Sequence, residues 1–522
     1  MAGFSLLKDP FLTYIPSLLL FPSRLSENMD IVANGEYELL RPAGPLEVLT
    51  DLFHDLGIQS NVRVSFQYSH ETKQLSPAKV FRALKVVIQE IPALSIIGVS
   101  QPSKKKPGNH RTWEAKLSSI CYRDCVEFLD DTDANDDYAL ARLYEENHNR
   151  WFDTHDTTKP WWKLVIVNRK TALFVFHHAI GDGISGYAFH KSLLAALNAD
   201  DFDQEPENDL INNKIFTIKE SSRKEEPIAI DEIDARLSWF HIIRTFLFWT
   251  LIRIFVSPKY LLFSDANVTN TFPTISKPFP VEERTRTRVE TLRVDRATMK
   301  ECLAKCREHQ TSFTALLHTI ISITFAADIY PHAKVGFTRV AVNIRPLMRR
   351  DPGPDVFTNA SATYYGTHLL GKYRAASQNE ISDKKAIWKL AANFKKHMTA
   401  SIYKSDEVLQ SYLTCRLLGE DNEEVGSFYG LGLYLNNSFL ISNIGVFHPR
   451  EDMKDGGWSV KDVGFGAAAI RAAVGDFGPV FSVASVKDGD CVIAATWEEG
   501  VLKEEMVRDV LGAVLRRLED LV

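Results

Sequence analysis

Apolar residues recur along this chain with two different periods, which alternate from one segment to the next. Residues 61–69 alternate apolar and polar side chains with the period of two that is typical of a strand. Residues 77–91 place Val80, Leu84 and Val87 three or four positions apart, which predicts a helix. Further strands are expected at 162–167, 173–177, 336–343, 438–443, 480–486 and 491–497, and further helices at 136–151, 185–197, 297–308, 313–327 and 503–521. Strands that alternate with helices in this way indicate the α/β class.

An acidic and polar stretch without clear periodicity, residues 198–232, interrupts this pattern. Such composition is typical of a linker. We therefore expect a hydrophobic N-terminal arm at residues 1–39, an N-terminal lobe at 40–205, a linker at 206–235 and a C-terminal lobe at 236–522. A site is expected where the two lobes meet, because ligand sites are frequent at such interfaces.

Two segments are unusually apolar. Residues 1–22 are interrupted by Lys8, Asp9 and two prolines, so we interpret them as an arm that packs on the fold or touches a membrane rather than as a secretory signal. Residues 239–255 run for only eight residues without a charge or histidine, whereas a membrane span needs about 20. Arg244 and Arg253 fall on opposite faces of a helix there. We expect a buried helix or a cover over a channel, with peripheral membrane contact as the alternative.

The composition excludes several classes of protein. The 522 residues are 45% hydrophobic and 25% charged, which is ordinary for a soluble globular protein. The 61 basic and 67 acidic residues leave a net charge of −6, which offers no electrostatic basis for binding nucleic acid. Six cysteines are too few for a disulfide scaffold. Two C-x-x-x-C pairs match the spacing of one helical face better than a zinc site, so we expect no metal.

The segment FVFHHAIGDGISGYAFH, residues 174–190, carries the strongest candidate chemistry. A strand leads into His177 and His178, and the pKa near 6.5 of a histidine suits a general base. Asp182 is expected to hold the following loop through a buried pair. A metal site that combines these residues with His190 is disfavoured, because neighbouring residues of a strand point in different directions. Without further information, satisfied polar packing stays open for the histidine pair.

The longer string from His177 to Gly183 resembles the H-H-x-x-x-D-G signature of the CoA-dependent acyltransferases. That superfamily includes chloramphenicol acetyltransferase, plant BAHD acyltransferases and peptide-synthetase condensation domains. LRPAGPLE at 40–47, PWWKLVIV at 160–167 and VNIRP at 342–346 are similar to its fungal alcohol O-acetyltransferase-like branch. The resemblance implies two chloramphenicol-acetyltransferase-like lobes, with mixed sheets flanked by helices and a tunnel at their interface.

The resemblance also implies roles for five residues. His178 matches the general base, and Asp182 matches a structural acid that points away from the substrate. Arg345 matches the arginine that pairs with this acid across the two halves. His177 matches a packing and positioning residue, and Gly183 a residue that keeps the channel open.

Further parts of the implied site are less specific. Ser442 and Asn443 match a strand that lines the channel, where substrate hydrogen bonds and simple packing are both open. CoA carries phosphates, so the basic clusters 104–106, 284–288 and 345–350 are candidates for one mouth of the tunnel, although each also fits a solvated surface.

Together these features predict an acyl-CoA-dependent O-acyltransferase that moves acetyl from acetyl-CoA to a small alcohol or a secondary-metabolite hydroxyl. The alternatives are an N-acyltransferase, a condensation-type enzyme with a carrier-bound acyl group, and a non-catalytic binding module of the same fold. We expect no permanently bound cofactor, with acetyl-CoA or a short acyl-CoA as co-substrate. We also expect a monomer in the cytoplasm, or at the surface of the endoplasmic reticulum or a lipid droplet, that binds no nucleic acid.

Overall fold

The computed structural model describes most of the chain. The described residues are 35–132, 136–199, 213–218, 233, 236–268, 271, 273–349, 352–353, 355–377, 380–404, 407–429, 437–449, 456–475 and 477–522. Most of the expected N-terminal arm and of the expected linker therefore lies outside the described residues. The described part of the linker contains a short strand, β9, which pairs with β5.

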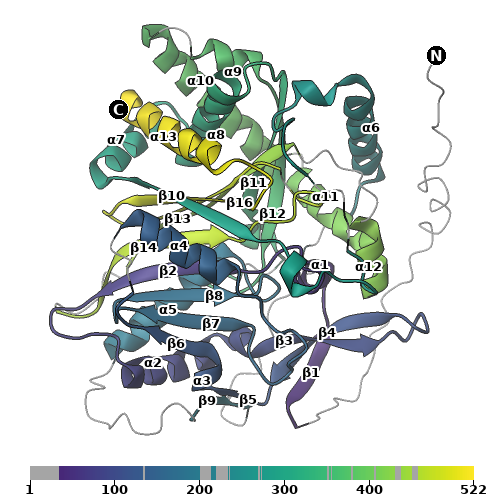
Figure 1. The fold of residues 1–522 in the computed structure, drawn as a ribbon, viewed down its shortest axis with the longest axis vertical. Coiled ribbons are helices and arrows are strands. Elements are labelled where there is room, and N and C mark those ends of the chain that lie inside the picture. The colour runs from purple at the N-terminus through teal and green to yellow at the C-terminus, as the bar shows by residue number, and fades with distance from the viewer. Residues whose placement is uncertain are drawn as a thin grey trace.

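Two large sheets, both mixed, form the body of the molecule (Figure 1). The first has the strand order β14-β2-β8-β7-β6, with only β6 and β7 parallel. The second has the order β10-β16-β15-β13-β11-β12, in which β13 runs parallel to β15 and β11. A smaller sheet joins β1, β4 and β3. This architecture confirms the fold class expected from the sequence.

The strands have the following bounds: β1 Tyr37–Pro42, β2 Val62–Ser69, β3 Ile96–Pro102, β4 His110–Leu117, β5 Ser119–Cys121, β6 Val126–Leu129, β7 Trp162–Val167, β8 Thr171–Phe176, β9 Lys214–Thr217, β10 Thr287–Val294, β11 Val335–Asn343, β12 Ser361–Leu369, β13 Ser438–Phe447, β14 Ser459–Ala467, β15 Val480–Val486 and β16 Cys491–Glu498. The central strands β7, β8, β15 and β16 are buried almost throughout, as expected for strands covered on both faces.

The helices have the following bounds: α1 Pro45–Asp55, α2 Pro77–Glu90, α3 Tyr122–Cys125, α4 Asp137–His148, α5 Gly183–Ala199, α6 Trp239–Phe255, α7 Arg296–Glu308, α8 Phe313–Thr324, α9 Gly371–Ala375, α10 Glu380–Tyr403, α11 Glu407–Leu413, α12 Asn422–Tyr429 and α13 Glu504–Leu521. Several begin at a side chain that accepts a hydrogen bond from the first turn, namely Ser76, Asp136, Asp295 and Ser312. Such caps satisfy backbone N–H groups that the helix itself leaves unpaired.

Helices cover the outer faces of the two sheets (Figure 1). Helices α2 and α5 pack with β2 around the apolar core of the N-terminal half. Helices α7, α8 and α13 enclose the core of the second sheet. Helix α4 lies between the two sheets and packs against β10, so Val289 of the C-terminal half shares a core with residues of the N-terminal half.

Strand β14 crosses from the C-terminal half into the sheet of the N-terminal half. It pairs antiparallel with β2 from Ser459 opposite Ser69 to Ala467 opposite Val62. Gly464 and Gly466 lie within this strand. The lobe boundaries expected at 205 and 235 stay predictions, but β14 shows that the two halves share a sheet.

Residues 239–255 were expected to form a buried helix or a cover over a channel; the expectation of burial is wrong, and the cover stays a prediction. The segment is helical, as α6, but within it only His241 is buried, and the helix stands at the periphery of the molecule (Figure 1). The apolar composition of the segment is that of a core helix. The sequence alone does not show whether another part of the protein packs on the outward face of such a helix. Among the described residues no single helix is long and apolar enough to span a membrane, although the bent pair formed by residues 296–308 and 313–329 meets that criterion by length and composition.

Candidate active site

His177 and His178 follow the end of β8 and lie where the N-terminal and C-terminal halves meet. Strand β8 lies between β2 and β7, and its residues Leu173, Phe174 and Phe176 are fully buried. The backbone N–H of His177 still donates to the carbonyl of Trp161, at 2.9 Å, so the strand pairing extends to the first histidine. Beyond it the chain turns within a few residues into α5, which starts at Gly183.

His178 is held by its own loop in one tautomer. Its Nδ1 lies 3.1 Å from the carbonyl oxygen of Gly181, which is an acceptor, so Nδ1–H donates and the lone pair resides on Nε2. Burial lowers the pKa of His178, an effect only partly opposed by the backbone hydrogen bonds and by Asp182. The imidazole is therefore neutral near pH 7, as a general base requires.

Asn359 is a neighbour of His178 that sequence analysis missed. Its amide nitrogen donates to the backbone carbonyl of His178 at 2.8 Å and lies 3.3 Å from Nδ1 of the ring. The side chain of Asn359 is buried, and it comes from the C-terminal half, 181 positions along the chain. Nothing in the local pattern around residue 359 marks it, because its importance comes only from the tertiary contact.

Asp182 and Arg345 form a buried, bidentate ion pair, with N–O distances of 2.8 and 2.9 Å. The carboxylate also accepts from the backbone N–H groups of Ser185 and Ala360. Burial acts to raise the pKa of Asp182, but the charge and hydrogen bonds of Arg345 outweigh it, so the pKa is lowered. The pairing expected across the halves is thus present, and it occupies both carboxylate oxygens.

Gly183 lies where the motif loop touches strands of the C-terminal half. A Cβ at this position would approach Ile444 Cγ2 to 2.6 Å and Phe465 Cζ to 2.7 Å. These distances are well below van der Waals contact, so only glycine fits without a shift of the Ile444 and Phe465 side chains. Close packing therefore explains why position 183 is a glycine. The expected role of Gly183 in keeping a channel open stays a prediction.

His177 is enclosed by rings. Its centroid lies 4.5 Å from those of both His54 and Trp161, and the side chain is fully buried. Its Nδ1 accepts from the N–H of Ala179 at 3.1 Å. Burial and the neighbouring His178 lower the pKa of His177 to about 3, so the ring packs as a neutral group.

Ser442 and Asn443 face opposite sides of the C-terminal sheet, since they are successive residues of β13. Asn443 donates to Thr314 of α8 at 3.0 Å and accepts from the N–H of Gly445, so its side chain serves the packing of α8. Ser442 is half-buried on the other face. Neither residue is among those that line the cavity described next, and a substrate contact of Ser442 or Asn443 stays a prediction.

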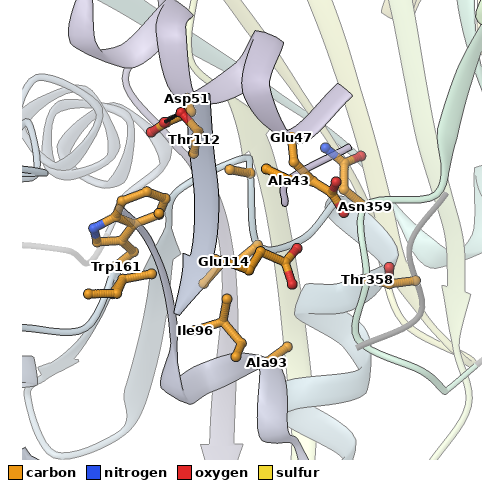
Figure 2. Close-up of a pocket in the computed structure, with 14 residues that line it drawn as sticks. Ala43, Glu47, Asp51, Ala93, Ile96, Thr112, Glu114, Trp161, Thr358 and Asn359 are labelled. Atoms are coloured by element: carbon orange, nitrogen blue, oxygen red, sulfur yellow. Dashed lines mark hydrogen bonds between the residues drawn. The ribbon is translucent and has the colours of Figure 1, made fainter. Parts of the chain in front are cut away.

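A narrow cavity lies beside the loop that follows β8, between the two halves (Figure 2). Ala179 and Ile180 of the N-terminal half and Thr358 and Asn359 of the C-terminal half line it. Figure 2 shows side chains of α1 and β4 around the same space, including the carboxylates of Glu47, Asp51 and Glu114. The cavity lies next to the segment that holds His178, while the continuous tunnel expected from the sequence stays a prediction.

The basic clusters proposed for CoA are largely engaged with acidic side chains. Lys105 pairs with Glu420, and Arg288 pairs with Glu504 at 2.6 Å. Arg345 is buried against Asp182. These contacts fit the structural interpretation of the clusters better than a free phosphate site, so no CoA contact is assigned to them.

The residues considered for a metal site do not converge. His190 hydrogen bonds Tyr68 and the carbonyl of Val64, and its ring stacks on Phe66 at 4.1 Å. Across the part of the chain that the structure describes, no group of three or more His, Cys, Asp or Glu side chains is arranged to hold a metal ion.

Comparison with known proteins places this geometry in context. The sequence model of the family described as "Alcohol acetyltransferase" matches residues 43–518. The probable alcohol acetyltransferase crmB of Aspergillus fumigatus is 24% identical over 491 residues, which cover 91% of this chain and 98% of that protein. The probable alcohol acetyltransferase FCK4 of Fusarium pseudograminearum is 23% identical, over 92% of this chain and 95% of that protein.

Solved structures of the same fold include an acetyltransferase and a condensation domain. The trichothecene 15-O-acetyltransferase TRI3 of Fusarium sporotrichioides superimposes with a TM-score of 0.65 at 12% identity, covering 96% of this chain and all of that one. The first condensation domain of the calcium-dependent antibiotic synthetase gives a TM-score of 0.55 at 10% identity, over 91% of this chain and 97% of that one. At such low identity these likenesses show the shared fold alone.

Proposed function

Since the chain belongs to the alcohol acetyltransferase family, and is therefore an acyltransferase that acts on oxygen, we propose that it moves an acetyl group from acetyl-CoA to the hydroxyl of an alcohol, with His178 as the general base. The acceptor class is a small alcohol or the hydroxyl of a secondary metabolite, in keeping with the fungal relatives. The observation that carries the proposal is the fixed tautomer of His178, whose Nδ1–H is engaged by the carbonyl of Gly181.

In the proposed reaction, Nε2 of His178 takes the proton of the acceptor hydroxyl as its oxygen attacks the thioester carbonyl carbon. The carbonyl oxygen carries the negative charge of the tetrahedral intermediate. When the intermediate collapses, the carbon–sulfur bond breaks, and the imidazolium returns the proton to the CoA sulfur. Both substrates bind before transfer, so proximity replaces a covalent acyl-enzyme.

Two features of the site support this role for His178. The lowered pKa keeps the ring unprotonated near neutrality, so that it accepts a proton without first losing one. The Asp182–Arg345 pair and Asn359 fix the loop from the C-terminal half, which limits the movement of the ring. Asp182 acts through this architecture rather than by contact with the reacting atoms.

The test measures release of free CoA thiol from acetyl-CoA with a panel of alcohols, in parallel with mass spectrometry of the ester. We expect His178→Ala to reduce the turnover number by about two to four orders of magnitude. His332→Ala, at an exposed histidine far along the chain, is the matched control and should retain full activity. Full ester formation by a folded His178→Ala variant would refute the role of this residue, and a need for amines or a carrier protein would refute the reaction.

A further inference from the structure

Helix α6 presents an apolar surface to solvent along its whole length. Eight of its exposed residues are large hydrophobics with no polar group. The most exposed of them are Phe240, at 75%, and Phe255, at 76%. The others are Ile243, Phe246, Leu247, Phe248, Leu251 and Ile254, and Trp239 at the start of the helix is also exposed. A continuous patch of this kind marks an interaction site in a soluble protein.

The opposite side of α6 is firmly attached to the C-terminal half. Trp249 and Ile252 pack against Leu261, Val335 and Phe337, and the rings of Trp249 and Phe337 lie 5.0 Å apart. Arg244 pairs with Glu407 of α11 at 2.8 Å. A groove of about 330 Å³ separates the rest of the helix from β11 and β12. The helix is therefore a fixed part of the fold, with its outward face held away from the sheet.

The apolar arc of α6 is wider than a protein partner usually covers. At about 100° per residue, Phe240, Ile243, Leu247, Leu251 and Ile254 fall within an arc of about 80°. The exposed aromatic residues on both sides widen the apolar arc to about 200°, whereas a helix that packs on protein commonly uses a stripe of about 100°. A surface into which the helix sinks can contact the whole arc, and lipid acyl chains provide such a surface.

The charges of the segment fit an anionic surface. Residues 237–264 contain no aspartate or glutamate, and their three cationic side chains are Arg244, Arg253 and Lys259. Arg253 falls about 20° beyond Phe246, at one flank of the apolar arc, whereas Arg244 falls beside Leu251 and pairs with Glu407. Long cationic side chains on the flanks of an interfacial helix reach lipid headgroups while the apolar face is among the acyl chains.

From these observations we propose that α6 docks the protein on an anionic lipid surface, with the helix axis in the plane of the interface and its apolar arc among the acyl chains. Seventeen residues at 1.5 Å per residue give about 25 Å, and with two arginines within them the helix is suited to lie on the membrane rather than to cross it. The inference goes beyond the proposed acyl transfer and does not depend on it.

The experiment is flotation of the full chain with vesicles of phosphatidylcholine alone and of phosphatidylcholine mixed with phosphatidylserine. We expect the protein to float with both, more strongly with the anionic vesicles, and less as salt is added. Phe240→Ser with Ile254→Ser should weaken binding by about tenfold or more, because both side chains lose apolar area that lipid would bury. Arg253→Gln should weaken binding to anionic vesicles by about fivefold and leave neutral vesicles nearly unaffected.

Val281→Ser is the matched control, since Val281 is 68% exposed but lies outside α6. Its binding should equal that of the parent protein, and the midpoint of denaturation of every variant should be unchanged, because the mutated side chains are exposed. Absence of parent flotation, or equal flotation of the α6 variants, would overturn the proposal. So would a dimer that the α6 variants dissociate without lipid, or binding that appears only after removal of residues 1–34, since a second copy or the N-terminal arm would then cover the helix.

Discussion

Arg345 binds both carboxylate oxygens of Asp182. Arg345 follows the end of β11, and through this ion pair it holds the loop that follows β8. The two residues are 163 positions apart and come from different halves of the chain. Arg345 also donates to the carbonyls of Val356 and Thr358, which adjoin Asn359. The same guanidinium therefore positions both segments that contact His178.

We expect Asp182→Asn to lower the free energy of unfolding by about 3–5 kcal/mol, because it leaves the Arg345 guanidinium buried without a counter-charge. Urea denaturation monitored by fluorescence measures the loss. Asp355→Asn is the control, since Asp355 pairs with Lys191 at the surface and should cost less than about 1 kcal/mol. Equal stability of the two variants would contradict a structural role for the buried pair.

Asn359 is expected to set the protonation of His178 as well as its position. Asn359→Asp would place a carboxylate near Nδ1 of the ring, which favours the imidazolium and raises the pKa of His178. In a plot of turnover number against pH, the fall in activity on the acidic side should therefore occur at higher pH. Asn359→Ala should lower turnover by about tenfold or more without that displacement.

The measurement for Asn359 is a pH–rate profile of each variant against the parent protein. Asn267→Ala removes an exposed asparagine and should leave the profile unchanged. If Asn359→Asp has the profile of the parent protein, the side chain does not interact with the base.

Gly183→Ala should destabilise the protein by about 1–3 kcal/mol, because the added Cβ meets Ile444 and Phe465 at less than 3 Å. Gly371→Ala at the start of α9 is a matched control, since a Cβ there meets no atom within 4 Å. Thermal denaturation of the two variants distinguishes them. A Gly183→Ala variant as stable as the parent protein would show that the side chains of Ile444 and Phe465 move aside at little cost.

Stability should fall as the pH decreases below about 6.5. The pKa of each of six buried histidines is lowered by burial, and they are His54, His148, His177, His190, His318 and His368. Below pH 6.5 the unfolded chain binds protons at these positions and the folded chain does not, so each contributes a loss of about 1.4 kcal/mol per pH unit.

Denaturant titrations between pH 7.5 and 5 measure this dependence. Asp51 acts in the opposite sense at lower pH, because burial and Asp55 raise its pKa and the folded state then binds the proton more tightly. A free energy of unfolding that stays constant down to pH 5 would contradict the net loss of stability expected from the buried histidines.

Elements with a strong period and clear caps were predictable from the sequence. The helix expected at 77–91 is α2 at Pro77–Glu90, and the strand expected at 480–486 is β15 with the same bounds. The apolar spacing within each such element reports directly which of its faces is buried. The motif from His177 to Gly183 was recognisable because its residues are contiguous.

Other features depend on contacts between distant segments and left no local signal. The half-buried strands β12 and β14 lack the apolar runs of the central strands, and the pairing of β14 with β2 joins residues almost 400 positions apart. Asn359 contacts His178 only because the loop before β12 folds back onto it. The exposure of α6 could not be read from its composition, because an apolar helix looks the same whether protein or lipid covers it.

The exchange of β14 has a consequence for how the chain reaches its native state. Until Ser459–Ala467 is in place, β2 ends the N-terminal sheet with a free row of N–H and C=O groups. Such an edge readily pairs with another chain. A fragment that stops before residue 459, whether from arrested synthesis or from truncation, should therefore aggregate through β2, even though every residue of the histidine motif is present in it.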